Sequence, residues 1–207
     1  MATLVDIVDR LCAWVDDNIC QKVMLKAAPI SEYEPDGAEY EYTRVKPACF
    51  PMYVPGTDKM PPKVKAPTPS VCVRIVGGED GRSEGTVGIE LWFSVWNPGT
   101  HGRDILKTVE NNPLAYMEWT GDEAEAYYKR DMEGWRDIWN WIDIALREIE
   151  SVASIDGLAI DRDKGIAFAP AKDEGGILDF YPYWFGYISF TLKRPIVRNV
   201  KEYDEML

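Results

Sequence analysis

His101 is the residue in this chain whose side chain is best suited to general acid–base chemistry, and it is the only histidine among 207 residues. It lies in the turn-rich segment NPGTHGRD, close to Asp104. An imidazole acts as a general base when a carboxylate orients it and a nucleophilic hydroxyl or thiol lies within reach. No serine or cysteine stands in a recognisable nucleophile elbow. The sequence therefore predicts that His101 has no catalytic role.

Two short motifs resemble ligand-binding loops but lie in the wrong context. The segment 77–81, GGEDG, falls between two predicted strands, whereas a dinucleotide-binding loop opens a helix. The segment 161–165, DRDKG, resembles the start of a calcium loop. Such a loop needs glycine at its sixth position and an acid at its twelfth, where this chain has Ile166 and Lys172. We interpret the first segment as a hairpin connection and the second as a turn.

The cysteines and carboxylates do not form a recognisable metal site either. The cysteines include no CxxC pair and have a single histidine to help them, so a zinc site is not expected. Cys12, among apolar residues of the first helix, and Cys72, within a predicted strand, are typical of small buried thiols in a reducing compartment. The four positions are Cys12, Cys20, Cys49 and Cys72.

Acidic side chains gather in or near loops, as the site of a two-metal hydrolase would require. In a chain with a formal net charge of −12, a solvated acidic surface is the simpler interpretation. We therefore expect no enzymatic activity and no bound metal or cofactor, with a metal-dependent hydrolase as an alternative. The acidic residues concerned are Glu79, Asp80, Asp122, Glu123, Glu125, Asp131 and Glu133.

The charge also limits the partners of the chain. A surface that grips nucleic acid by its phosphates needs a basic stripe, but 35 acidic residues outnumber 23 basic ones. We therefore expect no tight binding of nucleic acid. The beginning of the chain, MATLVDIVDR, carries acids where a signal peptide has basic residues, and no apolar run is long enough to cross a membrane. These features predict a protein made in a cytoplasm.

The elements that would position these residues predict an α+β fold. An amphipathic helix over 3–15 opens the chain, with Thr3 and Asp6 as its capping box. Strands over 71–76 and 86–96 form an antiparallel hairpin, and further short strands lie between 158 and 192. We expect an antiparallel sheet of about four to six strands, with the first helix and a Trp-rich helix on one face.

The predicted domain spans 1–195 and carries three additions. Nine of the fourteen prolines lie in 29–69, which predicts a Pro/Tyr-rich loop or arm with short strand pairing near residues 40–45. An acidic insertion follows at about 100–131, with two short helices. Residues 196–207 form a C-terminal arm.

The Trp-rich helix, predicted over 134–150, has apolar residues on more than one side. At about 100° per residue, one broad face points to the sheet. Trp141 and Ile144 lie outside that face, so either a second subunit or another part of the same chain covers them. The face itself holds Trp135, Ile138, Trp139, Ile142, Ala145, Leu146 and Ile149.

The last predicted strand, 184–192, is also apolar on both faces at its start. Trp184 shares one face with Ile188, while Phe185 and Tyr187 stand on the other. Large amphipathic rings favour protein interfaces. The predicted protein–protein contact residues are therefore Trp141, Ile144, Trp184, Phe185 and Tyr187.

Four segments together resemble the tail terminator, or tail-completion, proteins of long-tailed bacteriophages and prophages. They are APTPSVCVRIVGGEDG, EGTVGIELWFSVWN, EGWRDIWNWIDIALREI and YPYWFGYISFTLKRP. The resemblance covers roughly residues 1–30 and 65–195. The 29–69 arm and the acidic segment at 118–133 exceed the compact core of that family.

The resemblance implies a structural protein of the virion that assembles in the host cytoplasm. Its copies would form a ring, typically a hexamer, which caps the tail tube and joins it to the head–tail connector. DNA would pass through the ring, and acidic loops in its lumen would repel the DNA without holding it. Two alternatives remain: another head–tail connector protein, or a cytosolic module whose acidic face binds a basic protein.

Overall fold

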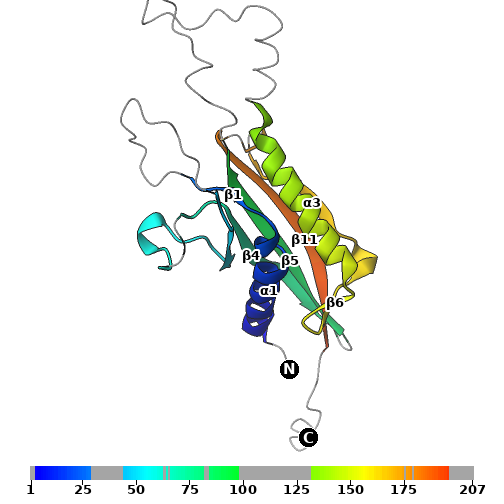
Figure 1. The fold of residues 1–207 in the computed structure, drawn as a ribbon. Coiled ribbons are helices and arrows are strands. Elements are labelled where there is room, and N and C mark those ends of the chain that lie inside the picture. The colour runs from blue at the N-terminus through cyan, green and yellow to red at the C-terminus, as the bar shows by residue number, and fades with distance from the viewer. Residues whose placement is uncertain are drawn as a thin grey trace, which may run out of the picture.

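A computed structural model describes residues 3–28, 44–62, 64, 66–81, 84–97, 132–174, 176–178 and 180–195. In this part of the chain, two α-helices cover one face of a five-stranded sheet (Figure 1). The predicted α+β class is confirmed, with the strand number inside the predicted range. The predicted helices at 100–131, the 196–207 arm, His101 and residues 29–43 lie outside the described residues.

The sheet has the order β3–β4–β5–β11–β8. β5 is its centre, and it pairs with β11 from Glu84↔Pro195 to Trp96↔Tyr183. Every second residue of β5 from Val87 is buried, because the helices cover that face. The strands span Ala48–Pro51 (β3), Ser70–Asp80 (β4), Glu84–Trp96 (β5), Ala167–Pro170 (β8) and Tyr183–Pro195 (β11).

The structure corrects two details of the sheet. β3 is an edge strand parallel to β4, whereas we predicted a wholly antiparallel sheet and a loop or arm over 29–69. A four-residue strand has too few residues to show a periodicity, and its parallel partner lies far along the chain. The hairpin connection is also shorter than predicted: segment 77–81 lies largely in β4, and a shift of register between Ile75 and Gly77 keeps the pairing with β5.

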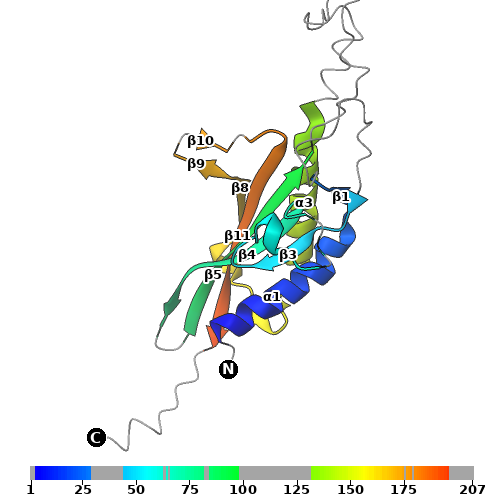
Figure 2. The ribbon, with the colours of Figure 1, turned by 90° about the vertical axis from the view of Figure 1, so that its left-hand side faces the viewer.

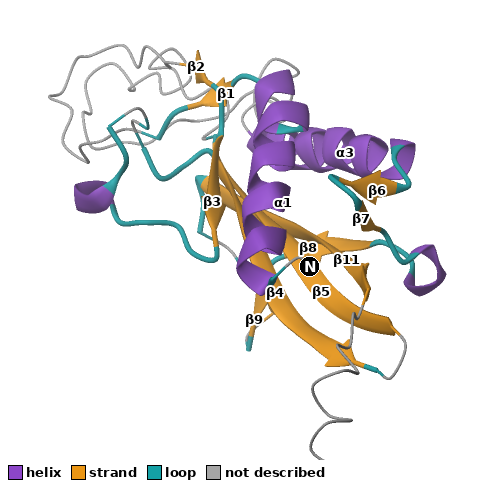
Figure 3. Ribbon diagram, turned by 90° about the horizontal axis from the view of Figure 1, so that it is seen from below, coloured by secondary structure: helices purple, strands orange, loops and turns teal. Residues whose placement is uncertain are grey.

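The two helices lie on the same face of the sheet, with their axes crossing steeply (Figures 2 and 3). α1, Leu4–Asn18, contacts β3 and β4, and α3, Arg136–Ser151, contacts β5 and β11. The predicted capping box is confirmed: Thr3 Oγ1 accepts from the Asp6 amide at 3.1 Å, and Asp6 Oδ2 accepts from the Thr3 amide at 2.9 Å. A 3₁₀ turn, η3 (Met132–Trp135), leads directly into α3.

Short elements complete the described chain. β6 and β7 form a tight hairpin through Asp156 and Gly157, both at positive φ, as the predicted turn there requires. No helix of the described residues is long and apolar enough to span a membrane. The short elements are η1 (Cys20–Lys22), β1 (Leu25–Lys26), β2 (Arg44–Val45), η2 (Thr57–Lys59), β6 (Ser154–Ile155), β7 (Leu158–Ala159), η4 (Arg162–Lys164), β9 (Lys172–Asp173) and β10 (Gly176–Ile177).

Candidate protein-interaction surface

Trp141 is part of the core, which corrects its predicted position outside the buried face. Its side chain is fully buried and makes an edge-to-face contact with Phe93 of β5, with ring centroids 4.9 Å apart. Trp135, predicted to face the sheet, is 43% exposed. The reason is local: Trp135 belongs to the 3₁₀ turn, so the 100° spacing of α3 cannot be extended back to it. Trp141 is therefore unavailable for a subunit contact.

Ile144 of α3 is half-buried, and so is Trp184, which lies on the helix-covered face of the sheet. Trp184 packs against the hydrophobic core, and its indole Nε1 donates a 2.9 Å hydrogen bond to the backbone oxygen of Asn97. Its ring also meets Tyr181 edge-on, with centroids 6.1 Å apart. Trp184 therefore holds the beginning of β11 against the end of β5.

Asn97 is the centre of a network of side-chain hydrogen bonds that fixes the beginning of α3. It is buried, and its side-chain nitrogen donates to Asp137 Oδ2 while its Oδ1 accepts from Lys26 Nζ at 2.8 Å. A Cβ atom added at Gly134 would collide with the Asn97 carbonyl, so only glycine fits there. The GWRDI segment thus has a packing role, because Gly134 and Asp137 dock α3 onto the end of β5.

The opposite face of the sheet carries a row of aromatic side chains, which we call the aromatic face. Phe185 and Tyr187 belong to it, as the alternation of the last strand predicted. Sequence reasoning missed the other three members, although Trp92 lies at an alternate position of a predicted strand. The aromatic face consists of Trp92, Phe180, Tyr183, Phe185 and Tyr187.

The rings of the aromatic face are ordered by contacts with one another. Trp92 and Tyr187 are cross-strand partners whose rings stack with centroids 5.2 Å apart and planes 20° apart. Phe185 stacks on Tyr183 at 6.5 Å and meets Phe180 edge-on at 6.3 Å. Aromatic pairs in these geometries add about 0.5–1.5 kcal/mol beyond their buried area. The rings of the aromatic face are therefore held in place by contacts within the chain itself.

Charged groups hold the Trp92 end of the aromatic face. The indole Nε1 donates a 2.7 Å hydrogen bond to Glu90 Oε2, and the Arg74 guanidinium lies 5.2 Å from the ring centroid. Arg74 and Glu90 are themselves cross-strand partners on β4 and β5. Trp92 thus has a fixed orientation, with one cation and one anion beside it.

The other end of the aromatic face is the more exposed. Phe180 is 57% exposed, and Ile177 of β10 is 67% exposed nearby in sequence. In Figure 2 the β9–β10 hairpin lies on the side of the sheet away from α1 and α3. A cluster of apolar rings on the solvent-exposed face of a sheet is unusual for a surface that contacts only solvent.

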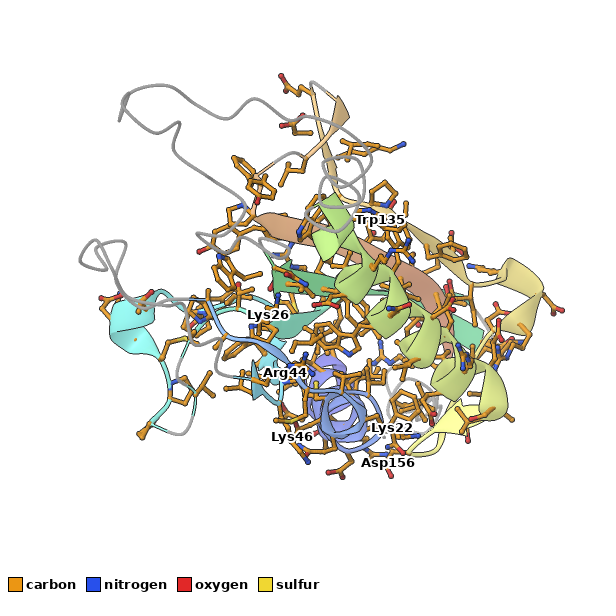
Figure 4. The ribbon with its side chains drawn as sticks, turned by 45° about the horizontal axis from the view of Figure 1, so that its top comes forward. Lys22, Lys26, Arg44, Lys46, Trp135 and Asp156 are labelled. Atoms are coloured by element: carbon orange, nitrogen blue, oxygen red, sulfur yellow. The ribbon has the colours of Figure 1, made fainter. Side chains whose placement is uncertain are left out.

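Basic residues gather elsewhere, near the C-terminal end of α1 and the β1–β2 pair (Figure 4). Lys22 Nζ lies 2.5 Å from Glu148 Oε1, and Lys46 Nζ donates to Gln21 Oε1 at 2.5 Å. Lys26 is bound to Asn97, and burial lowers its pKa. These three cations already have protein partners, and Arg44 is the fourth member of the group.

The motifs that resembled ligand sites have structural roles where they are described. Asp161 accepts a hydrogen bond from the Asp163 amide at the start of η4 and lies 3.7 Å from Lys193 Nζ. Within the described ranges, no group of three or more His, Cys, Asp or Glu side chains is arranged to hold a metal ion. The aromatic face is accordingly the candidate functional surface.

No protein-family model matches the chain, and no curated protein is similar to it at a significant level.

Proposed function

We propose that this chain is a structural protein of a long-tailed bacteriophage, a tail terminator whose copies form a ring. The observation that carries the proposal is the aromatic face, which lies on the sheet side opposite both helices. Four of its five rings belong to two neighbouring strands, so they lie beside one another on one face of the sheet. The type of assembly, a ring that caps a tail tube, is what the resemblance of four sequence segments to tail terminator proteins implies.

The chemistry of the aromatic face favours a protein partner. Tyrosine, tryptophan and phenylalanine are enriched at the centres of interfaces, where they bury a large area at a low cost in side-chain entropy. Stacking of Trp92 on Tyr187 and of Phe185 on Tyr183 has already ordered these side chains. Binding therefore costs little further ordering.

A second copy of the chain is the partner that a ring requires. In a head-to-tail ring, each subunit presents two different surfaces, and the rotation between neighbours closes the circle. We propose that the aromatic face of one subunit packs on a different surface of the next. The resemblance implies six copies, with the tail tube on one side of the ring and the head–tail connector on the other. The net charge of −12 suits a conduit that DNA crosses without binding.

The test compares assembly of the wild type with that of variants in the aromatic face. Size-exclusion chromatography with light scattering measures the copy number, alone and with purified tail tubes added. Phe180→Glu and Phe185→Glu place a charge on the surface and should abolish the ring and the capping of tubes. Tyr53→Glu is the control, because Tyr53 is 68% exposed and lies outside the aromatic face.

A wild type that stays monomeric and also ignores tail tubes would contradict the proposal. Rings that bind isolated connectors but never tubes would assign the chain to another class of connector protein. Rings that survive both glutamate variants would show that the aromatic face is not the subunit contact.

A further inference from the structure

A second group of apolar side chains lies at the edge of the sheet, on the side that the helices cover. Phe168 of β8 is 54% exposed, although its cross-strand partner Ile188 is fully buried in the core. Cross-strand partners point to the same face of a sheet, so Phe168 is on the helix side. α3 contacts β5 and β11, whereas β8 is one strand further out. Phe168 therefore stands at the outer border of the helical layer.

Other apolar residues of α3 and β8 continue this surface. The Trp139 ring meets the Phe168 ring edge-on, with centroids 6.4 Å apart. Leu146 follows Trp139 by about two helical turns and so lies on the same side of α3. Pro170 pairs with Gly186, which lies against α3. The β8 surface, as we call it, consists of the exposed Phe168 and the half-buried Trp139, Leu146, Ile166 and Pro170.

The β8 surface and the aromatic face lie on opposite sides of the same edge of the sheet. Tyr187 of the aromatic face pairs with Ala169 of β8, and Phe168, the residue before Ala169, points the other way. A head-to-tail ring needs two different surfaces on each subunit, because a single self-complementary surface closes a dimer. The two surfaces of this chain meet that requirement.

The charges beside the two surfaces favour a second copy of the chain as the occupant. With a net charge of −12, two copies repel one another wherever their acidic side chains meet. Beside the β8 surface, about one turn after Trp139, Asp143 lies 3.4 Å from Arg147. Beside the aromatic face, Arg74 and Glu90 are cross-strand partners. Each pair is neutral as a whole, so the two surfaces can meet without like-charge repulsion.

We propose that the β8 surface of one subunit packs on the aromatic face of the next. This inference rests on the proposed ring and names the second surface that the ring requires. Phe168 is the central contact, because it is the most exposed member of the β8 surface. Trp139 already supports its ring from within the subunit, so little side-chain freedom is lost when the surfaces meet.

The test asks whether two different subunits can supply the two surfaces. Phe168→Glu disrupts the β8 surface and keeps the aromatic face, whereas Phe180→Glu does the reverse. Each variant alone should stay monomeric in sedimentation velocity at concentrations where the wild type forms rings. Tyr53→Glu is the control and should form rings, because Tyr53 is exposed and lies outside both surfaces.

Mixing the two variants gives the sharper result. The mixture contains one intact surface of each kind, so it should form heterodimers with one copy of each variant and nothing larger. A tag on one variant lets native mass spectrometry identify the heterodimer. The mixture is measured over rising concentrations, since a single contact is weaker than a closed ring. Formation of the heterodimer also shows that both variants are folded.

Hydroxyl-radical footprinting of the wild type gives a readout that needs no variant. Oxidation of Phe168 and of Phe180 should both fall when monomers assemble, while oxidation of Tyr53 should not change. Phe168→Leu keeps an apolar side chain and should still form rings. Phe168→Ala should weaken the contact by roughly 30-fold, as truncation of a central interface residue does.

Three results would overturn the proposal while leaving the ring itself intact. One is ring formation by Phe168→Glu. Another is a homodimer of Phe168→Glu, which would mean that the aromatic face packs on itself. The third is unchanged oxidation of Phe168 in the wild-type ring. A wild type that stays monomeric and ignores tail tubes contradicts the proposed function, and this contact with it.

Discussion

The Asn97 side-chain amide donates a 2.6 Å hydrogen bond to Asp137 Oδ2. This bond joins the residue directly after β5 to the first turn of α3. Both partners are needed because Asn97 is buried and also accepts from Lys26. Asn97→Ala should therefore lower the free energy of unfolding by about 1–3 kcal/mol, the cost of leaving buried polar groups unpaired. Urea denaturation measures the change. Asn140→Ala, on the exposed side of α3, is the control and should have little effect.

The close approach of Gly134 to Asn97 predicts a second sensitive position. Gly134→Ala forces the Asn97 backbone away and should destabilise the protein by about 1–3 kcal/mol, as overpacking does. Thermal unfolding should show a lower Tm. At Gly56 the nearest atom to an added Cβ belongs to the flexible side chain of Asp58, so Gly56→Ala should be almost neutral. Equal losses in the two variants would contradict the role given to Gly134.

The two tryptophans of the helical segment should respond in opposite ways to truncation. Trp141→Ala removes a fully buried ring from Phe93 and should cost about 3–5 kcal/mol. Trp135→Ala removes a ring that is 43% exposed and should cost much less. Chemical denaturation of both variants compares them directly. A larger loss for Trp135 would restore the sequence-based orientation of the helix.

Arg162 closes the C-terminal end of α3 from another segment. Its Nη2 donates to the backbone oxygens of Ile149 at 2.7 Å and Val152 at 2.6 Å. These bonds satisfy carbonyls that a helix end leaves free, so Arg162→Ala should cost about 1–3 kcal/mol. Arg147→Ala is the control, since Arg147 is exposed and its contact with Asp143 is a surface pair. Hydrogen exchange should be faster in the last turn of α3 only in the first variant.

The capping box of α1 predicts a dependence of stability on acid pH. Hydrogen bonds from the Thr3 backbone and hydroxyl lower the pKa of Asp6 from its ordinary 3.8. A carboxyl whose pKa is lower in the folded state stabilises the protein above the unfolded pKa, and this contribution is lost as the pH falls through the folded pKa. The stability difference between the wild type and Asp6→Asn should therefore be constant near neutral pH and shrink below about pH 4. A difference that does not change with pH would show that the ionised carboxylate contributes nothing.

Local patterns were enough to predict the regular elements. The Thr3–Asp6 box and the apolar stripe placed α1, and the alternation from Val87 placed the buried face of β5. The same alternation put Phe185 and Tyr187 on the face away from the helices. These predictions succeeded because each depends on residues a few positions apart, whose relative directions the helix or strand geometry determines.

Contacts between segments far apart in the sequence determined the features that local patterns did not predict. The burial of Trp141 depends on Phe93 of β5 lying beneath the helix, with ring centroids 4.9 Å apart. The parallel pairing of β3 with β4 joins segments whose own patterns carry no sign of it.

The sequence by itself determined the class of fold, the capping of α1, and the absence of any familiar catalytic motif. Only the tertiary structure decided that Trp92 joins Phe185 and Tyr187 on one surface and that Asn97 holds Asp137. The physical reason is that periodicity records directions within one element. Which elements meet depends on how the whole chain buries its apolar faces together.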